Sequence, residues 1–183
     1  MSGDRIPKAF FVTSGVGMDI VQANAFDRAL CDAGIGGCNL VEVSSILPAG
    51  IVEVKQSSVS MRPGEITFCV LSRADGKSGE VIGAGIGYGW MTGVKEDANG
   101  EEQIKSESEP ESESEPWSEF GIISEDHGHY SEKYLTARIE EKLYTMAKIR
   151  GKKIHLKKML VDSVEVENGS FFGSVVVALV FVF

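Results

Sequence analysis

The sequence predicts an α+β fold in which mixed or antiparallel sheets carry helices on their outer faces. Only residues 24–33 and 131–150 have helical periodicity, whereas most other segments have strand character. Two helices are too few to cover both faces of a parallel sheet through repeated crossovers. The 183 residues, 43% of them hydrophobic, suit one core, so we predict a single domain over 1–183.

The N-terminal segment is predicted to form a strand, a loop and a helix. The apolar run Lys8–Thr13 is typical of a strand, and the two glycines of Ser14–Val21 indicate a loop. Asn24–Ala33 places apolar side chains on one side at helical spacing. Asn24 is a favoured N-cap residue, and Gly34 suits the position that follows a helix.

The middle of the chain is predicted to contain strands. Asn39–Leu47 alternates between apolar and polar residues, and Ile51–Val54 is a candidate extension of it. Glu65–Arg73 and Glu80–Met91 indicate two strands joined by a turn. The second contains G-A-G-I-G-Y-G, which is not a dinucleotide-binding fingerprint because no helix follows it. We expect instead that another element packs closely on this glycine face.

The last part of the chain is predicted to be strand, helix, strand, strand. Trp117–Ser124 resumes the strand pattern, and Ser131–Arg150 is an amphipathic helix that ends at Gly151. Ile154–Val166 and Ser170–Phe183 are two further strands around a turn. The last is a continuous apolar run, typical of a strand buried on both faces.

The net charge of −9 is concentrated in one segment. Residues 101–119 contain eight Glu and one Lys, a net of −7, which leaves −2 for the rest of the chain. The low-complexity run at about 97–116, with the repeat SESESEPESESEP, is predicted to be a disordered insert within the domain. Because the chain has no basic stripe, we expect no nucleic-acid partner.

The sequence shows no metal, membrane or secretion signal. Cys31, Cys38 and Cys69 lack metal-ligand spacing, and we expect small buried residues in a reducing compartment. His127 and His129 have no further Cys or His nearby. The N-terminal apolar run is too short for a signal peptide, and no apolar segment is long enough for a transmembrane helix. We expect no metal, no membrane association and a cytoplasmic location.

Ser44 and Ser45 stand at the end of an apolar strand, just before Ile46, Leu47 and Pro48. Their types and spacing alone favour a strand exit in which the hydroxyls bond to nearby backbone. A serine hydrolase is not indicated, because the chain has no G-x-S-x-G elbow and no histidine in an obvious partner position.

The neighbourhood of these serines adds a second interpretation. Asn24–Gly50 contains N-A-F-D, A-G-I-G, N-L and S-S-I-x-P in that order, and weaker motifs follow as G-I-I-S-E at Gly121–Glu125 and M-A-K-I at Met146–Ile149. This pattern resembles the pyruvoyl-dependent arginine decarboxylases over most of the chain outside the acidic insert. The resemblance implies an αββα sandwich assembled as trimers or dimers of trimers, with active sites between subunits.

The resemblance also implies self-cleavage between Ser44 and Ser45. The Ser45 hydroxyl attacks the Ser44 carbonyl, and elimination then leaves a covalent pyruvoyl group at position 45. Residues 1–44 become the β chain of this zymogen, and residues 45–183 become the α chain. The pyruvoyl group forms a Schiff base with L-arginine and accepts the electrons left by CO₂, yielding agmatine for polyamine biosynthesis or acid resistance.

Three further residues match positions of the family. Asn39 matches a position associated with processing and catalysis, where its amide would stabilise an oxyanion. Glu125 matches the catalytic glutamate, a general acid that requires a pKa raised by burial, with Glu119 and Asp126 as competitors. Asp27 matches the acidic residue near the substrate side chain, although a carboxylate in the first helical turn also stabilises the helix dipole.

Two departures and two alternatives remain. The acidic repeat is an insertion, and Ala49 follows Pro48 where some family members carry a second proline. One carboxylate at Asp27 would also attract lysine or ornithine, so a pyruvoyl decarboxylase for another amino acid is the nearest alternative. The other is a non-processing homologue that acts as a binding or assembly protein, with the acidic segment as its partner site.

Overall fold

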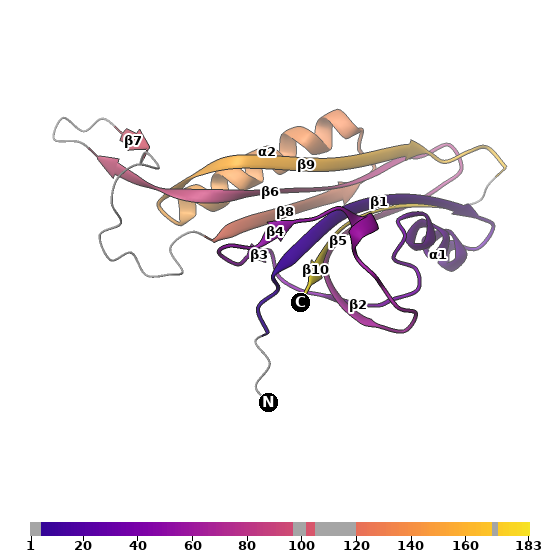
Figure 1. The fold of residues 1–183 in the computed structure, drawn as a ribbon. Helices are drawn as coiled ribbons and strands as arrows, with labels where there is room; N and C mark the ends of the chain where they lie inside the picture. Colours follow the sequence, from indigo (N-terminus) through magenta and orange to yellow (C-terminus); the bar gives the residue numbers. More distant parts are fainter. Residues whose placement is uncertain (1–4, 97–101, 105–119, 170–171) are drawn as a thin grey trace.

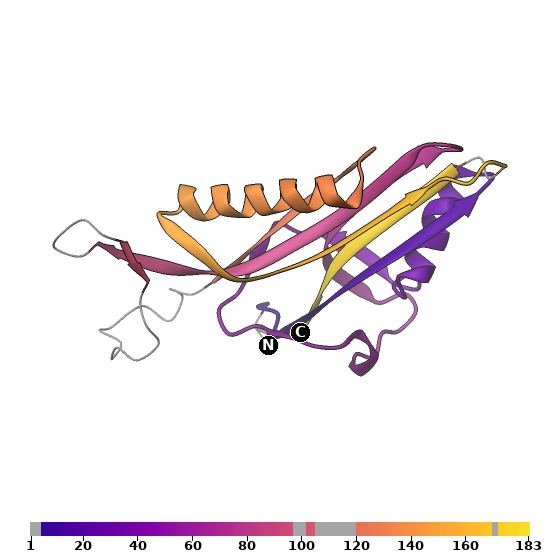
Figure 2. The ribbon, with the colours of Figure 1, turned by 90° about the horizontal axis from the view of Figure 1, so that it is seen from above.

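The computed structural model of the chain describes residues 5–96, 102–104, 120–169 and 172–183. These residues form two stacked sheets with one helix outside each sheet, as Figure 1 and Figure 2 show from two sides. The predicted α+β sandwich with mixed and antiparallel sheets is therefore confirmed. Within the described residues, no helix has the length and apolar character that crossing a bilayer requires. The acidic run predicted to be disordered lies almost entirely outside this part of the chain.

The first sheet is mixed and has the strand order β2-β5-β10-β1-β4. Its long strands pair antiparallel, whereas β2 and β4 are short and run parallel to β5 and β1. Its strands are β1 (Ala9–Asp19), β2 (Asn39–Glu42), β4 (Val52–Glu53), β5 (Ile66–Lys77) and β10 (Phe172–Val182). A 3-10 turn at Gln56–Ser58 follows β4.

The second sheet is antiparallel, with β8 and β9 on either side of β6 and the short β3 next to β8. The fifth strand, β7, pairs with the far end of β6, beyond the body of the sandwich in Figure 1. The strands are β3 (Ile46–Leu47), β6 (Val81–Glu96), β7 (Glu102–Ile104), β8 (Gly121–Gly128) and β9 (Lys152–Glu165).

Three apolar clusters fill the three interfaces between the four layers. The largest lies between the sheets, one joins the first sheet to α1 (Gln22–Asp32), and one joins the second sheet to α2 (Glu132–Ile149). Strand β10 contributes to two of them: Val175 and Val177 face the other sheet, whereas Val176 and Ala178 face α1. Successive side chains of a strand point to opposite faces, so a strand between two layers needs the continuous apolar run that the sequence shows.

The predicted loop at Ser14–Val21 is wrong, because β1 continues to Asp19. Its two glycines, Gly15 and Gly17, allow α1 to pack closely on β1. A Cβ at Gly15 would lie 2.2 Å from the Ala29 carbonyl oxygen, and a Cβ at Gly17 would lie equally close to the backbone of Ala25. Glycine on this face lets α1 approach the strand more closely than any side chain would allow.

The start of α1 also differs from the prediction. Val21, not Asn24, occupies the N-cap position, and the helix begins at Gln22. The carboxylate of Asp19 accepts hydrogen bonds from the Val21 N–H, the Asn24 amide and Arg28. The helix ends as expected, with Gly34 at a φ of +72° just beyond it.

The glycine face of β6 is closely packed by another element, as predicted, and that element is α2. A Cβ at Gly85 would lie 2.7 Å from Ile139, and one at Gly87 would lie 2.5 Å from the same side chain. Ile139 is fully buried together with Leu135 and Leu143 of the helix stripe. The missing side chains therefore set how near α2 lies to its sheet.

The segment Asn39–Leu47 is not one strand. Its first half, β2, belongs to the first sheet, and its second half, β3, belongs to the second. Val43 still donates a backbone hydrogen bond to Cys69 of the first sheet, whereas the Ser45 carbonyl accepts one from Ile123 of the second. The chain crosses between the two sheets at the adjacent serines.

The cysteines are only partly as expected. Cys69 is buried beneath α1 and Cys38 is partly buried, but Cys31 is exposed. The expectation of burial is therefore wrong for Cys31, which lies on the outward side of α1, where no layer covers it.

Candidate active site

Ser44 and Ser45 form a tight turn between the sheets. The Ile46 N–H donates a hydrogen bond of 3.1 Å to the Ser44 carbonyl oxygen across the intervening Ser45. The Ser45 carbonyl accepts the Ile123 N–H at 3.0 Å, which continues the pairing of β3 with β8. The bond between the two serines is thereby held at both ends by backbone contacts.

The Ser45 side chain contacts Glu125. Its hydroxyl donates a hydrogen bond of 3.2 Å to Glu125 Oε2, and both groups are partly buried. Glu125 lies on β8, three residues beyond Ile122, which pairs with the first residue of β3. The two residues that the resemblance singles out for cleavage and for proton transfer are therefore adjacent in space.

Asp126 is unsuited to act as the acid in place of Glu125. Its carboxylate accepts hydrogen bonds from Arg138 Nε at 2.7 Å and pairs with Lys142 Nζ at 3.0 Å. Burial by itself would raise the pKa of Asp126, but these two cations outweigh burial and hold the pKa below its usual range. A carboxylate held ionised cannot supply a proton near neutral pH. Glu119, the other competitor, lies outside the described residues.

A cavity of about 470 Å³ opens beside this pair. One wall comes from the Ser45 turn and β8, and the other comes from α2. Its lining residues are Ser45, Ile123, Ser124, Glu125, Glu141, Lys142, Thr145 and Met146. The volume lies within the range of pockets that hold small metabolites. The two α2 pairs, Glu141 with Thr145 and Lys142 with Met146, have the i, i+4 spacing of one helix face. The sequence motifs do not assign Glu141, Thr145 or Lys142 to a site.

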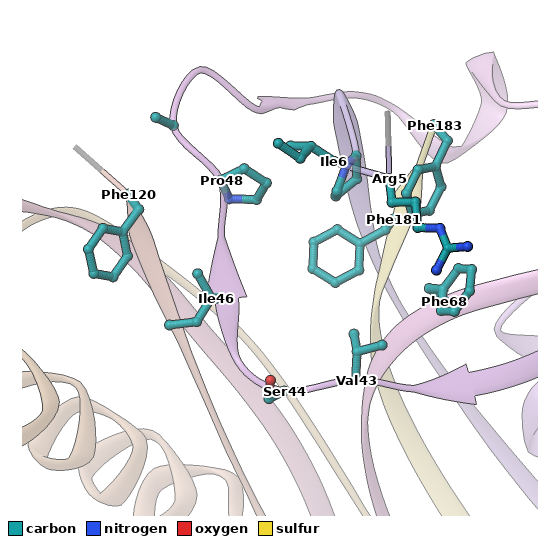
Figure 3. A pocket seen from close by; sticks show the side chains of 12 residues that line it. Arg5, Ile6, Val43, Ser44, Ile46, Pro48, Phe68, Phe120, Phe181 and Phe183 are labelled. Atoms are coloured by element: carbon teal, nitrogen blue, oxygen red, sulfur yellow. The ribbon is translucent and has the colours of Figure 1, made fainter. Parts of the chain in front are cut away.

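A second, apolar cavity of about 800 Å³ lies on the other side of the serine turn. Figure 3 shows Val43, Ser44 and Ile46 along one wall and the rings of Phe68 and Phe181 across from them. Ser44 lines this apolar cavity, whereas Ser45 lines the polar one.

Asn39 and Asp27 do not join this pair within one chain. The Asn39 amide donates a hydrogen bond of 2.9 Å to the Gly64 carbonyl, at the start of β2. Asp27 is exposed on α1, which packs on the outer face of the first sheet. The helix α1 lies outside the first sheet and α2 lies outside the second (Figure 2), so both sheets separate Asp27 from the cavity beneath α2.

The sequence is similar to those of known proteins. The sequence profile described as pyruvoyl-dependent arginine decarboxylase matches residues 9–183. The chain belongs to this family. A pyruvoyl-dependent arginine decarboxylase of Methanocella arvoryzae is 33% identical over 97% of this chain and 96% of its own. The enzyme of that name from Methanopyrus kandleri is 30% identical over 96% of this chain and 97% of its own. The enzyme of that name from Methanococcoides burtonii is 39% identical over 73% of this chain and 63% of its own.

The cofactor of a pyruvoyl-dependent arginine decarboxylase is a covalently bound pyruvoyl group. The residues present fit such a group at position 45. The Ser45 side chain reaches a cavity of metabolite size, and a carboxylate lies within hydrogen-bond distance of it. Among the described residues, no group of three or more His, Cys, Asp and Glu side chains is placed to hold a metal ion.

Proposed function

We propose that this chain cleaves itself between Ser44 and Ser45 and then decarboxylates L-arginine to agmatine and CO₂. The supporting observation is the hydrogen bond of 3.2 Å between the Ser45 hydroxyl and Glu125, beside a cavity, in a chain of this family. A serine hydroxyl is a poor nucleophile unless a base takes its proton, and the Glu125 carboxylate is in position to do so.

The cleavage step uses the backbone of the serine turn. Ser45 Oγ attacks the Ser44 carbonyl carbon, and the Ile46 N–H already donates to the oxygen that becomes the oxyanion. Collapse breaks the amide and leaves an ester. Loss of the Ser45 α-proton then expels the Ser44 carboxylate, which ends the β chain of residues 1–44. The dehydroalanine left at position 45 takes up one water and releases one ammonia, and a pyruvoyl group remains.

In turnover, the pyruvoyl group would supply a ketone that binds the substrate amine and accepts the electron pair left on the substrate when CO₂ departs. Glu125 delivers a proton to the carbon that loses the carboxyl group, because its carboxyl group lies within hydrogen-bond distance of the side chain at position 45. Asp126 remains paired with Arg138 and Lys142 and takes no part in this transfer.

Substrate selection is proposed to involve a neighbouring subunit of a homotrimer, or of a dimer of trimers. Asp27 is exposed and separated from the cavity of its own chain by both sheets, so it would serve the site of another copy. The apolar cavity and its exposed rim, including Ile46 and Phe183, offer a surface for that contact. Asn39 is also exposed, and its proposed role in processing and catalysis would be performed in the assembly.

Intact-mass analysis of purified protein tests cleavage, and product analysis tests the substrate. We expect a fragment of residues 1–44, and a larger fragment without a free N-terminal amine that releases CO₂ and agmatine from arginine. A single full-length species would refute self-processing and favour the binding-protein alternative. Turnover of lysine, ornithine or histidine in place of arginine would leave the pyruvoyl chemistry intact and refute the substrate.

A further inference from the structure

Glu125 lies on a strand edge that lacks a neighbouring strand in the described chain. The pairing of β3 with β8 covers only Ile46 with Ile122 and Leu47 with Gly121, followed by the Ile123 hydrogen bond to Ser45. Peptide groups of a strand face the same edge at every second residue. The Glu125 carbonyl therefore faces the edge that Ile123 uses, but β3 does not extend to it.

In place of a neighbouring strand, the side chain of Lys142 from α2 bonds to this edge of β8. Its ammonium donates a hydrogen bond of 3.0 Å to the Glu125 carbonyl and lies 3.0 Å from Asp126 Oδ2. On the other side, the buried Ser72 hydroxyl donates to the Asp126 carbonyl at 2.8 Å. The backbone that carries Glu125 is thus held from the helix side and from the first sheet.

Arg138 provides an internal comparison. It lies one turn before Lys142 on the same helix and contacts the same carboxylate, Asp126, at 2.7 Å. Its other described hydrogen bond goes to the Tyr134 hydroxyl. Arg138 and Lys142 therefore share one anion, but the Glu125 carbonyl is bonded to Lys142.

We propose that Lys142 is a positioning residue, which holds the Glu125 backbone so that its carboxyl group stays within reach of position 45. This inference rests on the proposed function. A carboxyl group that shifts by a fraction of an ångström remains able to bind substrate nearby but transfers its proton less often. Losing Lys142 therefore lowers kcat more than it changes KM.

The test compares Lys142→Met, Lys142→Arg, Arg138→Met and Lys133→Met as full chains. The side chain of Lys142 is 40% exposed, so methionine fits without crowding the core. Lys133 is an exposed lysine of the same helix and controls for loss of charge. Rates are expressed per cleaved α chain, which separates processing from turnover, and thermal unfolding confirms that each variant is folded.

For Lys142→Met we expect kcat to fall about tenfold or more, with KM changed by less than about twofold. Lys142→Arg recovers most of kcat because the guanidinium again donates to the Glu125 carbonyl. Arg138→Met and Lys133→Met stay within about twofold of wild type in kcat. If Arg138→Met loses as much kcat as Lys142→Met, the loss of kcat comes from disrupting the ion pairs of Asp126 and not from the bond of Lys142 to Glu125. The inference is then wrong.

The inference and the proposed function fail in different ways. If wild-type protein is cleaved and active but Lys142→Met has the wild-type kcat, only the role of Lys142 is refuted. If wild-type protein is neither cleaved nor active, the proposed function fails first, and the role of Lys142 fails with it.

Discussion

Ser45 Oγ lies 3.2 Å from Glu125 Oε2, although 80 positions separate the two residues in the chain. The contact depends on β3, a strand of two residues that pairs with β8 immediately after the serine turn. The first sheet holds the other side of the turn through Val43. The Ser44–Ser45 bond therefore lies between the two sheets, and the hydroxyl that we propose as the nucleophile contacts a carboxylate of the second sheet.

Replacing Ser45 with alanine is expected to prevent both self-cleavage and turnover, because the hydroxyl that attacks the Ser44 carbonyl is gone. Denaturing gels and intact mass would show one full-length species. Ser44→Ala is the matched control: it keeps the attacked carbonyl and the Ile46 hydrogen bond, so cleavage should continue. Normal cleavage in Ser45→Ala would show that the scissile bond lies elsewhere.

Replacing Glu125 with glutamine keeps the shape of the side chain but removes the proton that it transfers. We expect kcat for arginine, per cleaved α chain, to fall about 10²- to 10⁴-fold, the usual contribution of a positioned acid or base. Cleavage during expression should also slow, because Ser45 loses its base. Glu132→Gln, an exposed glutamate at the start of α2, should have wild-type kinetics. An unchanged kcat in Glu125→Gln would assign proton transfer to another group.

Gly17→Ala tests the close approach of α1 to β1. The added Cβ would lie 2.2 Å from the Ala25 carbonyl oxygen, so the helix must move. The free energy of unfolding should fall by about 1–3 kcal/mol, as for other overpacked sites. Gly37→Ala is the control, since its Cβ would lie 3.8 Å from the nearest atom, Pro63 Cα. Urea unfolding of both variants measures the difference, and equal stabilities would contradict the packing argument.

Glu53 links the two sheets in a pH-dependent way. Its carboxylate on β4 accepts hydrogen bonds from Tyr88 of β6 at 2.8 Å and from Lys158 of β9 at 2.5 Å. Burial alone would raise the pKa of Glu53, but these two donors outweigh it and lower the pKa from the ordinary value of 4.5.

The stability that Glu53 contributes is therefore present above pH 4.5 and is lost as the pH falls through its lowered folded-state pKa. We expect Glu53→Gln to be less stable than wild type at pH 7. The gap between their free energies of unfolding should narrow as the pH falls. Urea unfolding at several pH values measures this gap. Glu167→Gln, at an exposed position, should show no such pH-dependent gap. A constant gap for Glu53→Gln would refute the linkage.

Local sequence signals predicted the kinds of element better than their extents. The glycines at 15 and 17 indicate a loop by sequence alone, because glycine is common both in loops and in strands beneath a closely packed helix. Only the position of α1 in the folded protein distinguishes a loop from a strand beneath a helix. The alternation of Asn39–Leu47 predicted extended chain correctly, but alternation carries no information on which sheet each half joins.

The candidate site was predictable in part, because a motif marks the reactive position but not its surroundings. Ser45 and Glu125 came from the family resemblance, and the fold brings them together. Asn39 and Asp27 stay predictions, since one chain keeps Asp27 away from the cavity. Lys142 gave no signal, because a lysine beside an amphipathic stripe resembles any solvated helix residue until its partner is known.

By itself, the sequence determined the layered α+β class, the buried last strand, the close packing of another element on the glycine face and the family to which the chain belongs. These follow from side-chain periodicity and local chemistry, which act over a few residues. Tertiary structure alone decided where the chain changes sheets, which carboxylate lies beside Ser45 and which lysine supports it. Each of these depends on contacts between distant segments, and such contacts form only when burial of the three apolar clusters stacks the layers.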